Sequence, residues 1–433
     1  MKNKIIATLT IFTLAISNSV NVFAALEVVD PVATETDSSE FENLDIDLAK
    51  YAYLFENEDF EYSPIYDIDD AAYAIKTTKQ NSEAQTFNLS VEQAMLFLLY
   101  KNDIDFDEEE KDLIDSKNKA LGEGSTYEAT VNPELGVNSS YDDGLTGYSV
   151  NIAPYVSYQS SLYQYDYLLD ILDDTEELLL DGYESMITQL AIADIQYKLG
   201  IDLLEKSLEE QEKELSRTQL KYELGYVSDV DLDDAIKDLD KQKRSLTTQL
   251  NNYKNFKIGV SQQLGLKETD VVNFDYDLAL EPVEKTADEY VNYFLQYSPQ
   301  VNMDAAERQL YNDLYDLTSV FYQEDSSTLE SAEEKKDSVA TSTNDSISKV
   351  MSATRQNYIS LENTVTDVNN AEIALKQAKD TYDRNVLMYD LGYISKSVLD
   401  LAALTVTQAE NNFVTALYSY DTDRLALEKS YLN

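Results

Sequence analysis

Long stretches without proline or glycine limit what this 433-residue chain can fold into. Residues 155–281 and 300–433 contain no proline, and no glycine lies between Gly265 and Gly392. Strands joined by tight turns need both residues at frequent intervals, whereas the interiors of long helices exclude them. The sequence therefore predicts a mainly α fold built from long helices.

The charge and the missing residue types narrow the possible functions. The chain has 82 acidic and 33 basic residues, a formal net charge of −49, and neither histidine nor cysteine. It therefore lacks the side chains for thiol nucleophiles, disulfides, zinc fingers, Ser-His-Asp triads and imidazole bases. Binding to nucleic acid needs clustered Lys and Arg, which this chain does not have. Two carboxylates acting as acid and base are the remaining catalytic alternative, but no pair stands apart among so many acids. We predict a protein that is not an enzyme, needs no cofactor and binds no nucleic acid.

The first segment has the pattern of a secretory signal peptide. Lys2 and Lys4 are followed by an apolar stretch at residues 5–16 and by small and polar residues up to Ala24. About 12 apolar residues are too few to cross a hydrocarbon layer of about 30 Å. We predict that residues 1–24 are a signal peptide and that the chain is exported.

An acidic leader is predicted for residues 25–87. Between residues 27 and 70 the only basic residue is Lys50. A run of like charges is usually solvated, so we expect the leader to be partly disordered, with one short helix at residues 67–79. From Ser90 the pattern changes to a helix N-cap followed by apolar residues, which predicts that a helix begins there.

One region has strand character. Residues 127–158 contain short runs that alternate between apolar and polar side chains on both sides of an Asp-Asp-Gly turn at 142–144. Alternation around such a turn predicts one β-hairpin in an otherwise helical chain. Its strands are predicted at residues 127–131, 135–137, 148–152 and 155–158.

The chain contains an internal repeat. Residues 222–235 recur at 389–402 with an offset of 167 and no gap, and eight of the fourteen positions are identical. Apolar residues on both sides of each copy are spaced by threes and fours, which is the seam of a coiled coil or an antiparallel bundle. A duplicated helical hairpin with coiled-coil-like packing explains both observations.

Each copy carries the signals of a helix stop and a helix start. Gly225 and Gly392 are expected in the left-handed conformation that ends a helix, and Ser228 and Ser395 are expected to cap the returning helices. The Tyr-Val and Tyr-Ile pairs after the glycines are expected to fold back as the apolar contact of the stop. The helix that arrives at the first turn is predicted to begin near Leu162.

Aspartates are concentrated at the start of the first returning helix. Three of them within residues 229–233 suit the positive end of a helix dipole. Residues 229–240 also imitate a calcium-binding loop, but Asp234 stands where that loop needs glycine, so we predict no metal site. Residues 103–110 imitate such a loop in the same way, and we expect a solvated acidic loop there.

These motifs resemble the TolC family of outer-membrane efflux proteins. Members of that family carry two repeats, each with a G-x-[VI]-S turn before a helix start that contains Leu-Asp and Ala, as at residues 225–235 and 392–402. Three shorter segments are similar to the family's first helix start, the end of its first half and the start of its second half. They lie at residues 89–94, 264–266 and 298–301. The resemblance covers residues 88–430.

The resemblance implies a fold and a function. Members are homotrimers in which three chains close a long helical tube, capped at one end by a β-barrel in the outer membrane. The tube is a passive efflux duct that works with a periplasmic adaptor and an inner-membrane pump. The two repeats of this chain would span residues 88–266 and 267–433. Residues 325–350, where the second β-hairpin should lie, are polar and without strand character, so we expect the barrel to be reduced or absent.

The resemblance also assigns roles to residues at the repeated turns. Two sets would form the tips that dock the adaptor: Gly225, Tyr226, Val227, Ser228, Gly392, Tyr393, Ile394 and Ser395. An acidic constriction beside them would comprise Asp229, Asp231, Asp233, Asp234 and Asp400. We expect this negative mouth to favour cations and to repel anions.

The expected location is the outer membrane and periplasm, or the cell surface where no outer membrane exists. An exported coiled-coil structural or surface protein derived from the same family, with no pore, is the alternative. The two differ in oligomeric state, because a trimer is expected for the duct and a monomer for the alternative.

Overall fold

The structure is a computed structural model. It describes residues 48–55, 61–80, 83–128, 153–276, 285–322 and 326–432, together with Leu44, Ile46, Leu278, Leu280 and Val283.

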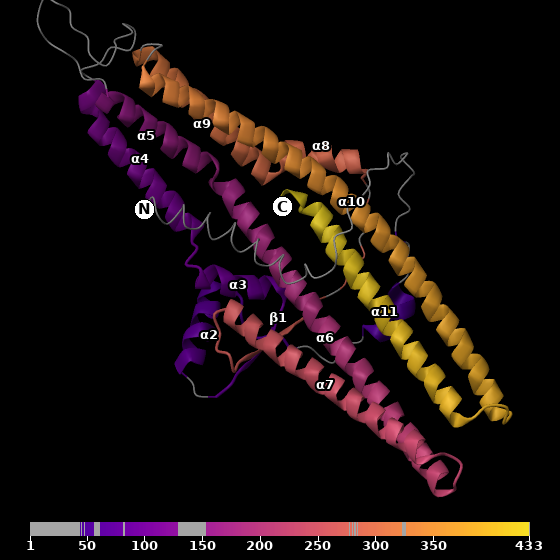
Figure 1. Cartoon of the computed structure of the whole chain (residues 1–433). Helices are drawn as coiled ribbons and strands as arrows, with labels where there is room; N and C mark the ends of the chain where they lie inside the picture. Colours follow the sequence, from indigo (N-terminus) through magenta and orange to yellow (C-terminus); the bar gives the residue numbers. More distant parts are fainter. Residues whose placement is uncertain are drawn as a thin grey trace, which may run out of the picture.

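Two long helical hairpins dominate the molecule. Figure 1 shows them side by side, with their turns at the same end. In each hairpin two antiparallel helices pack against each other. This confirms the mainly α fold and the duplicated hairpin. The first hairpin is α6 (Leu172–Glu223) with α7 (Asp229–Gln263), and the second is α10 (Ser327–Asp390) with α11 (Lys396–Glu428).

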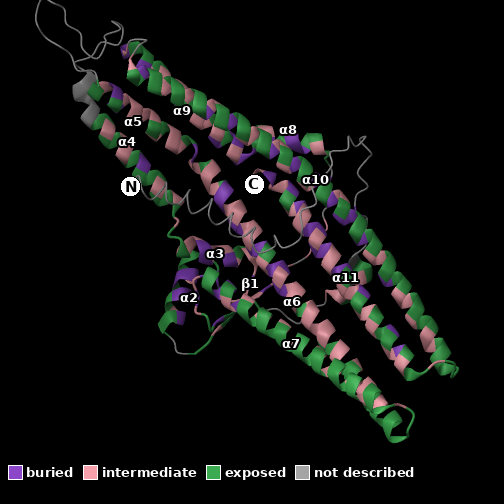
Figure 2. Ribbon diagram, viewed as in Figure 1, coloured by how far each residue is buried: buried purple, intermediate pink, exposed green. Residues whose placement is uncertain are grey.

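The seam of the second hairpin is buried more completely than that of the first. Leu361, Val368 and Leu375 recur every seven residues on α10 and are buried in one cluster with Phe413 and Leu417 of α11. On α7, by contrast, the buried residues lie only near its C-terminal end. Figure 2 shows the same difference, with purple residues along the second hairpin and mostly green residues along α7. The half of the first hairpin nearest its turn is therefore a two-helix coil with a half-exposed seam.

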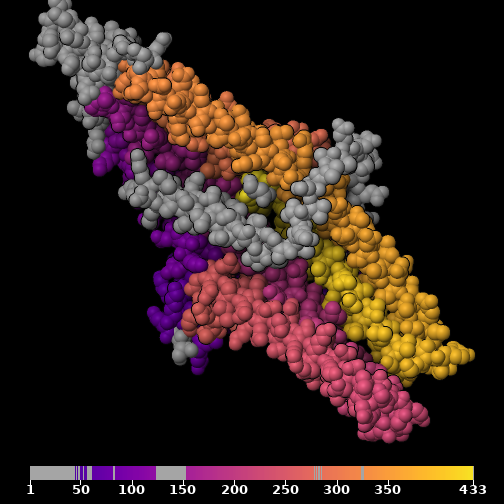
Figure 3. All heavy atoms as spheres, viewed as in Figure 1, coloured from indigo at the N-terminus to yellow at the C-terminus, as the bar shows by residue number. Residues whose placement is uncertain are grey.

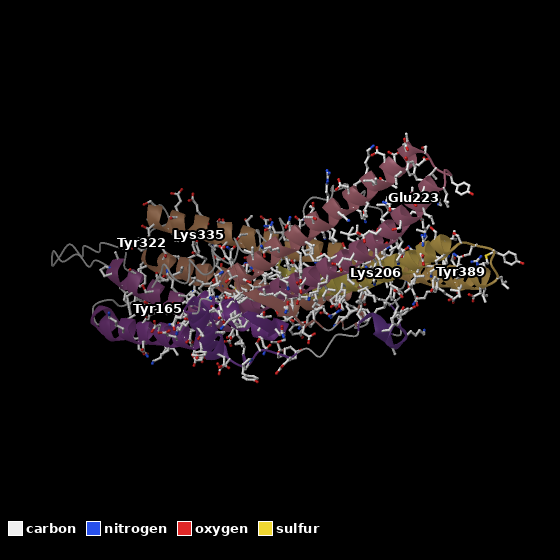
Figure 4. All side chains as sticks on the ribbon, turned by 90° about the horizontal axis from the view of Figure 1, so that it is seen from below. Tyr165, Lys206, Glu223, Tyr322, Lys335 and Tyr389 are labelled. Atoms are coloured by element: carbon white, nitrogen blue, oxygen red, sulfur yellow. The ribbon has the colours of Figure 1, made fainter. Side chains whose placement is uncertain are left out.

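Four helical segments extend the molecule at the end opposite the turns. Tyr165 and Tyr322 mark this end in Figure 4, whereas Glu223 and Tyr389 mark the turns. Here α4 packs on α5, α5 on α9, and α9 on the first part of α10. The bounds are α4 (Phe106–Glu128), α5 (Ala153–Asp170) and α9 (Pro299–Phe321).

The prediction of a single helix from near Leu162 to the first turn is wrong in one respect. Ile171 interrupts it between α5 and α6, with φ −91° and ψ 1°. The Ile171 side chain is buried together with Leu178 and Met303, and Met303 belongs to α9. A contact between helices thus sets the break, which the spacing of residues along one helix does not reveal.

The predicted β-hairpin at about 127–158 lies only partly within the described residues. Residues 129–152 are outside them, and residues 127 and 128 end α4. The last predicted strand, 155–158, is wrong because these residues belong to α5. Val156 is buried with Phe321 of α9, and Tyr155 meets the same ring edge-on with centroids 5.6 Å apart. Packing between helices decides the conformation of this short run, whose alternation fits either structure.

The polar stretch at residues 325–350 is helical within the described residues, in agreement with the prediction that it is not a strand. It forms the first part of α10. The hydroxyl groups of Thr341 and Thr343 each donate to the carbonyl four residues earlier, at 2.9 Å. These bonds satisfy hydroxyl groups on the helix itself. Leu329, Val339 and Val350 of the stretch are buried, and this part of α10 packs against α9.

A small α/β unit lies beside α6 and α7. The strands β1 (Thr86–Leu89) and β2 (Val271–Phe274) form a two-stranded parallel sheet. Helices α2 (Ile68–Gln80) and α3 (Val91–Lys101) pack with it, and both begin close to their predicted starts. Ser90 caps α3 in a capping box with Gln93, as its position predicts. The sheet itself was not predicted, because it joins segments 185 residues apart.

Part of the acidic leader packs on the second hairpin instead of remaining in solvent. The short helix η1 (Leu48–Leu54) places the Tyr51 ring 4.6 Å from that of Phe413. The prediction of a solvated leader is wrong for this part, because aromatic side chains among the acids find an apolar surface on α11. We call residues 48–55 the N-terminal strap. The boundaries of the leader and of the two repeats remain predictions.

The acidic loop predicted at residues 103–110 is partly helical. Helix α4 begins at Phe106, and the Asp105 carboxylate accepts a hydrogen bond from the backbone N–H of Glu108 at 3.0 Å. The acids of this segment therefore serve as a helix cap and a first turn.

The remaining elements are α8 (Ala287–Tyr297) and η3 (Ser430–Leu432). Among the described residues, no helix combines the length and the apolar character that crossing a membrane requires.

The turn glycines allow a direct test of the helix stops. Gly225 and Gly392 have positive φ, and an added Cβ at either position would meet no atom within 4 Å. Alanine there is therefore penalised by backbone conformation alone, and we expect each change to lower the free energy of unfolding by about 1 kcal/mol. Gly259→Ala is the matched control, because this exposed glycine is inside α7 with equally open space. Its expected effect in urea denaturation is a gain of about 0.5–1 kcal/mol. Equal effects at the three positions would contradict the assigned stops.

Candidate functional site at the hairpin tips

Both hairpins end in the same backbone motif. Gly225 and Gly392 have φ values of 75° and 74°. The tyrosine N–H after each glycine donates to the carbonyl five residues earlier, at 2.8 Å in both turns. The glycine N–H donates to the carbonyl three residues earlier. This is a Schellman motif, which requires positive φ at the glycine position. The predicted helix stops are confirmed.

The tyrosines that follow the glycines point into solvent. Tyr226 and Tyr393 are 78% and 74% exposed, so the expectation that they fold back on the helix is wrong. The free end of a two-helix hairpin offers no further surface on which a ring can pack. Val227 and Ile394, the next residues, are half-buried.

Leucines at matching positions extend this exposed apolar surface. Leu224 and Leu391 immediately precede the glycines and are 61% and 70% exposed. Leu220 and Leu387, one turn earlier, are 57% and 65% exposed. Large apolar side chains gathered at a surface commonly mark an interaction site. Figure 3 shows the ends of the two hairpins as separate projections, so each presents its own apolar surface.

The starts of the returning helices differ between the tips. Ser228 caps α7, and it forms a capping box with Asp231. Hydrogen bonds from the Ser228 backbone and hydroxyl hold the pKa of Asp231 below its usual range. Ser395 has the extended backbone of an N-cap, but its side chain makes no capping bond. The residue three positions later is Val398, which cannot accept a hydrogen bond as Asp231 does.

The charge of the two tips also differs. Asp233 and Asp234 of α7 are 61% and 65% exposed and, among the described residues, form ion pairs only with Lys237 of the same helix. Asp229 is exposed in the first turn. Helix α11 begins with Lys396 and has no acid in its first turn. The first tip is therefore strongly acidic, whereas the second is not.

Asp400 connects the two hairpins. Its side chain is 12% exposed and accepts hydrogen bonds from Arg217 of α6 at 2.8 Å and from Lys396 at 3.0 Å. Burial opposes the charge of Asp400, but these two bonds outweigh it and lower the pKa of the carboxyl. Arg217 also pairs with Glu214 at 3.2 Å, and Glu214 accepts from Ser397 of α11 at 3.1 Å. We call these contacts the tip bridge.

The sequence missed the tip bridge because its partners are far apart in the chain. The resemblance places Asp400 in an open acidic constriction together with the aspartates of α7, but the structure pairs it with the basic residues Arg217 and Lys396. Arg217 and Glu214 carried no signal of their own, since ion pairs at helical spacing are common on exposed faces. The exposed leucines did have a signal in the sequence, because Leu224 and Leu391 are separated by the 167-residue offset of the repeat.

No metal centre is visible at the tips or elsewhere in the described ranges. Within them, no group of three or more carboxylates has an arrangement that could hold a metal ion. The segment at 229–240 that imitates a calcium loop is the first part of α7.

Comparisons with known proteins identify the fold. No family model matches the sequence, and no curated protein matches it. The outer-membrane channel OprN superposes with a TM-score of 0.50 at 12% identity, covering 92% of this chain and 98% of that chain. The chain has the fold of an outer-membrane channel. A membrane protein from Pseudomonas aeruginosa superposes with a TM-score of 0.53 at 10% identity, covering 79% of this chain and 93% of that chain. The resemblance to the TolC family is thereby confirmed as a likeness of fold.

The tip bridge predicts a pH-dependent stability difference. The pKa of Asp400 is lower in the folded chain than the value of about 3.9 in an unfolded one. Its stabilising contribution is therefore complete above about pH 4 and is lost as the pH falls through the folded pKa. Asp400→Asn should lower the thermal midpoint at pH 7, and the difference from the unchanged chain should shrink steadily as the pH falls below about 4. Asp233→Asn is the control and should have little effect at either pH, because Asp233 is exposed and pairs only within α7. A difference that persists unchanged in acid would contradict the bridge.

Proposed function

We propose that the protein is the duct component of a TolC-like efflux or secretion system, a passive homotrimeric channel of the outer membrane and periplasm. The observation that supports this most is the pair of matched tips at the free ends of two long hairpins. They occur in a chain with the fold of OprN, which is an outer-membrane channel. A duct needs a wall and docking surfaces but no catalytic side chains, which agrees with the missing histidine and cysteine.

Self-association accounts for apolar side chains that remain exposed along the hairpins. Ile359 and Ile373 of α10 are 52% and 54% exposed, and Ile236 and Leu250 of α7 are 46% and 43% exposed. Each pair is separated by two heptads, so its members lie on one face of a coiled-coil helix. These faces are not covered by the described part of the same chain. Helices of neighbouring copies would cover them in a closed tube.

Native mass spectrometry of the mature chain in detergent tests the trimer. We expect a trimer for the unchanged chain. Ile359→Asp with Ile373→Asp places two charges in the proposed contact and should weaken association at least tenfold, equivalent to about 1.4 kcal/mol.

The control for this experiment is Tyr66→Asp with Tyr73→Asp. These tyrosines of the α2 region are 82% and 73% exposed and lie outside the hairpins, so the trimer should persist. A monomer of the unchanged chain would refute the duct and support the alternative, an exported structural or surface protein without a pore.

We propose that the two tips dock a periplasmic adaptor, which links the duct to an inner-membrane pump. The exposed leucines and tyrosines beside each glycine supply the apolar part of this surface. The proposed docking residues are Gly225, Tyr226, Val227, Ser228, Gly392, Tyr393, Ile394 and Ser395.

We propose further that the acids of α7 give the mouth of the duct a negative potential. In a trimer each of Asp229, Asp231, Asp233 and Asp234 occurs three times around one axis. Like charges that line a narrow opening raise the local concentration of counter-ions. Cations should therefore pass in preference to anions.

Single-channel conductance in planar bilayers tests the mouth. Asp231→Asn with Asp234→Asn should reduce the cation preference measured from the reversal potential in a salt gradient. Asp170→Asn with Asp316→Asn is the charge-matched control, because these exposed aspartates lie toward the opposite end of the molecule. If the first variant still conducts with unaltered selectivity, the proposal that the acids of α7 set the cation preference is wrong.

A further inference from the structure

The N-terminal strap contacts helices of both hairpins. It follows 47 residues of predicted signal peptide and acidic leader and carries three aromatic side chains, Tyr51, Tyr53 and Phe55. Its helix η1 lies against α10 and α11, and its last residues reach a cluster that includes α6. A segment before the first repeat thus joins the second repeat to the first.

The strap holds α10 and α11 through two tyrosines. The Tyr51 hydroxyl donates to Glu372 of α10 at 2.6 Å, while its ring packs on Phe413 of α11. The Tyr53 hydroxyl donates to Glu410 of α11 at 3.0 Å and accepts a hydrogen bond from the Lys379 ammonium of α10. Burial and the bond to Glu372 raise the pKa of Tyr51 to about 12, and burial raises the pKa of Tyr53, so both hydroxyl groups are protonated donors at physiological pH.

The end of the strap reaches the first hairpin. Leu54 and Phe55 pack against a cluster in which Ile192 of α6 is buried with Val414 and Tyr418 of α11. The Phe55 and Tyr418 rings meet edge-on with centroids 6.4 Å apart. Apolar contacts of this kind are insensitive to screening by salt, unlike an exposed ion pair.

Direct contacts between α6 and the second hairpin occur at three heights. At the end of α11, Lys429 pairs with Asp181 at 2.9 Å. At mid-height, beside the strap, the Asn411 amide donates to the carbonyl of Leu199 at 3.0 Å. The third is the tip bridge, where the Arg217 side chain is 29% exposed. Ion pairs at partly exposed sites contribute about 0–1 kcal/mol and weaken with salt, so we expect the tip bridge to open before the apolar contacts beside the strap.

We propose that the N-terminal strap is a clamp that fixes the second hairpin to α6 at mid-height, so that separation of the hairpins is confined to the part between the strap and the tips. The strap covers the junction of α6, α10 and α11 with aromatic side chains, while the hairpins below it are joined by the tip bridge. When that bridge opens, the strap sets the height from which the tips diverge.

Distances between spin labels within one chain test the clamp. The chain has no cysteine, so label pairs can be introduced without removing any residue. One pair, Tyr226→Cys with Tyr393→Cys, reports on the tips. The other, Glu205→Cys with Asn412→Cys, reports on the height of the strap. Labelled chain is mixed with excess unlabelled chain, so that only distances within a chain are measured.

In the chain with an unchanged strap, raising the salt from about 0.05 M to about 1 M should broaden the distance distribution of the tip pair about twofold. The distance distribution of the mid-height pair should stay the same. In the clamp variant, Tyr51→Ala with Phe55→Ala, the mid-height distribution should broaden as well. Tyr66→Ala with Tyr73→Ala removes two exposed aromatic side chains from the leader and is the matched control, expected to behave as the unchanged chain. Helix content from circular dichroism verifies that each variant is folded.

Tyr51→Phe with Tyr53→Phe serves if the clamp variant does not fold. It removes the two hydroxyl bonds and keeps the rings, so it should broaden the mid-height distribution by a smaller amount. A mid-height distribution that stays the same in both strap variants would overturn the proposal, as would tip and mid-height pairs that broaden together in the unchanged chain. The clamp is a property of a single chain, so its failure would leave the trimeric duct untouched, and a monomer would leave the clamp untouched.

Discussion

Each hairpin depends on one apolar seam shared by two antiparallel helices. In the second hairpin, Leu361, Val368 and Leu375 are buried at seven-residue intervals, and each such side chain contributes about 1.5–3 kcal/mol. Helical propensity alone is marginal, so the polar first part of α10 depends on its packing against α9 and on the burial of Leu329, Val339 and Val350. The seam also creates the surface on which the N-terminal strap lies. The first hairpin buries its seam less, and α7 in particular depends on contacts outside its own pair.

The sequence predicted those features whose signals lie close together in the chain. Gly225, Ser228 and their counterparts in the second copy announced the turns, because a helix stop needs a residue with positive φ and a helix start needs a side-chain acceptor. Features that join distant segments were missed. The parallel sheet, the strap and the pair of Arg217 with Asp400 all depend on which surfaces meet after folding. Residues 155–158 were wrongly predicted as a strand for a related reason. Their alternation fits a strand as well as a helix, and the buried contact with Phe321 that decides between them comes from a distant segment.

The two tips combine an identical backbone with different electrostatics. Both have the glycine stop and the exposed leucine and tyrosine, but only the first has a capping aspartate and further acids. Near the second tip, Asp400 is engaged by Arg217 and Lys396. Duplication thus preserved the turn while the charges diverged. Any partner that contacts both tips meets two surfaces of similar shape and unlike charge.

The parallel sheet has a consequence for the order in which the chain folds. Its first strand lies at the start of the first repeat and its second strand follows that repeat, so the sheet closes nearly all of the repeat into one loop. Closing so long a loop is entropically costly and slow, which delays the sheet until the hairpin inside it has formed. The strand at 86–89 can pair only after residues 271–274 have been synthesised, and the pairing needs no later part of the chain. The core cluster around the sheet contains only residues up to 276. This part of the protein is therefore able to form before the second half of the chain is available, whereas α5 and α6 also need α9 and α11 to complete their packing.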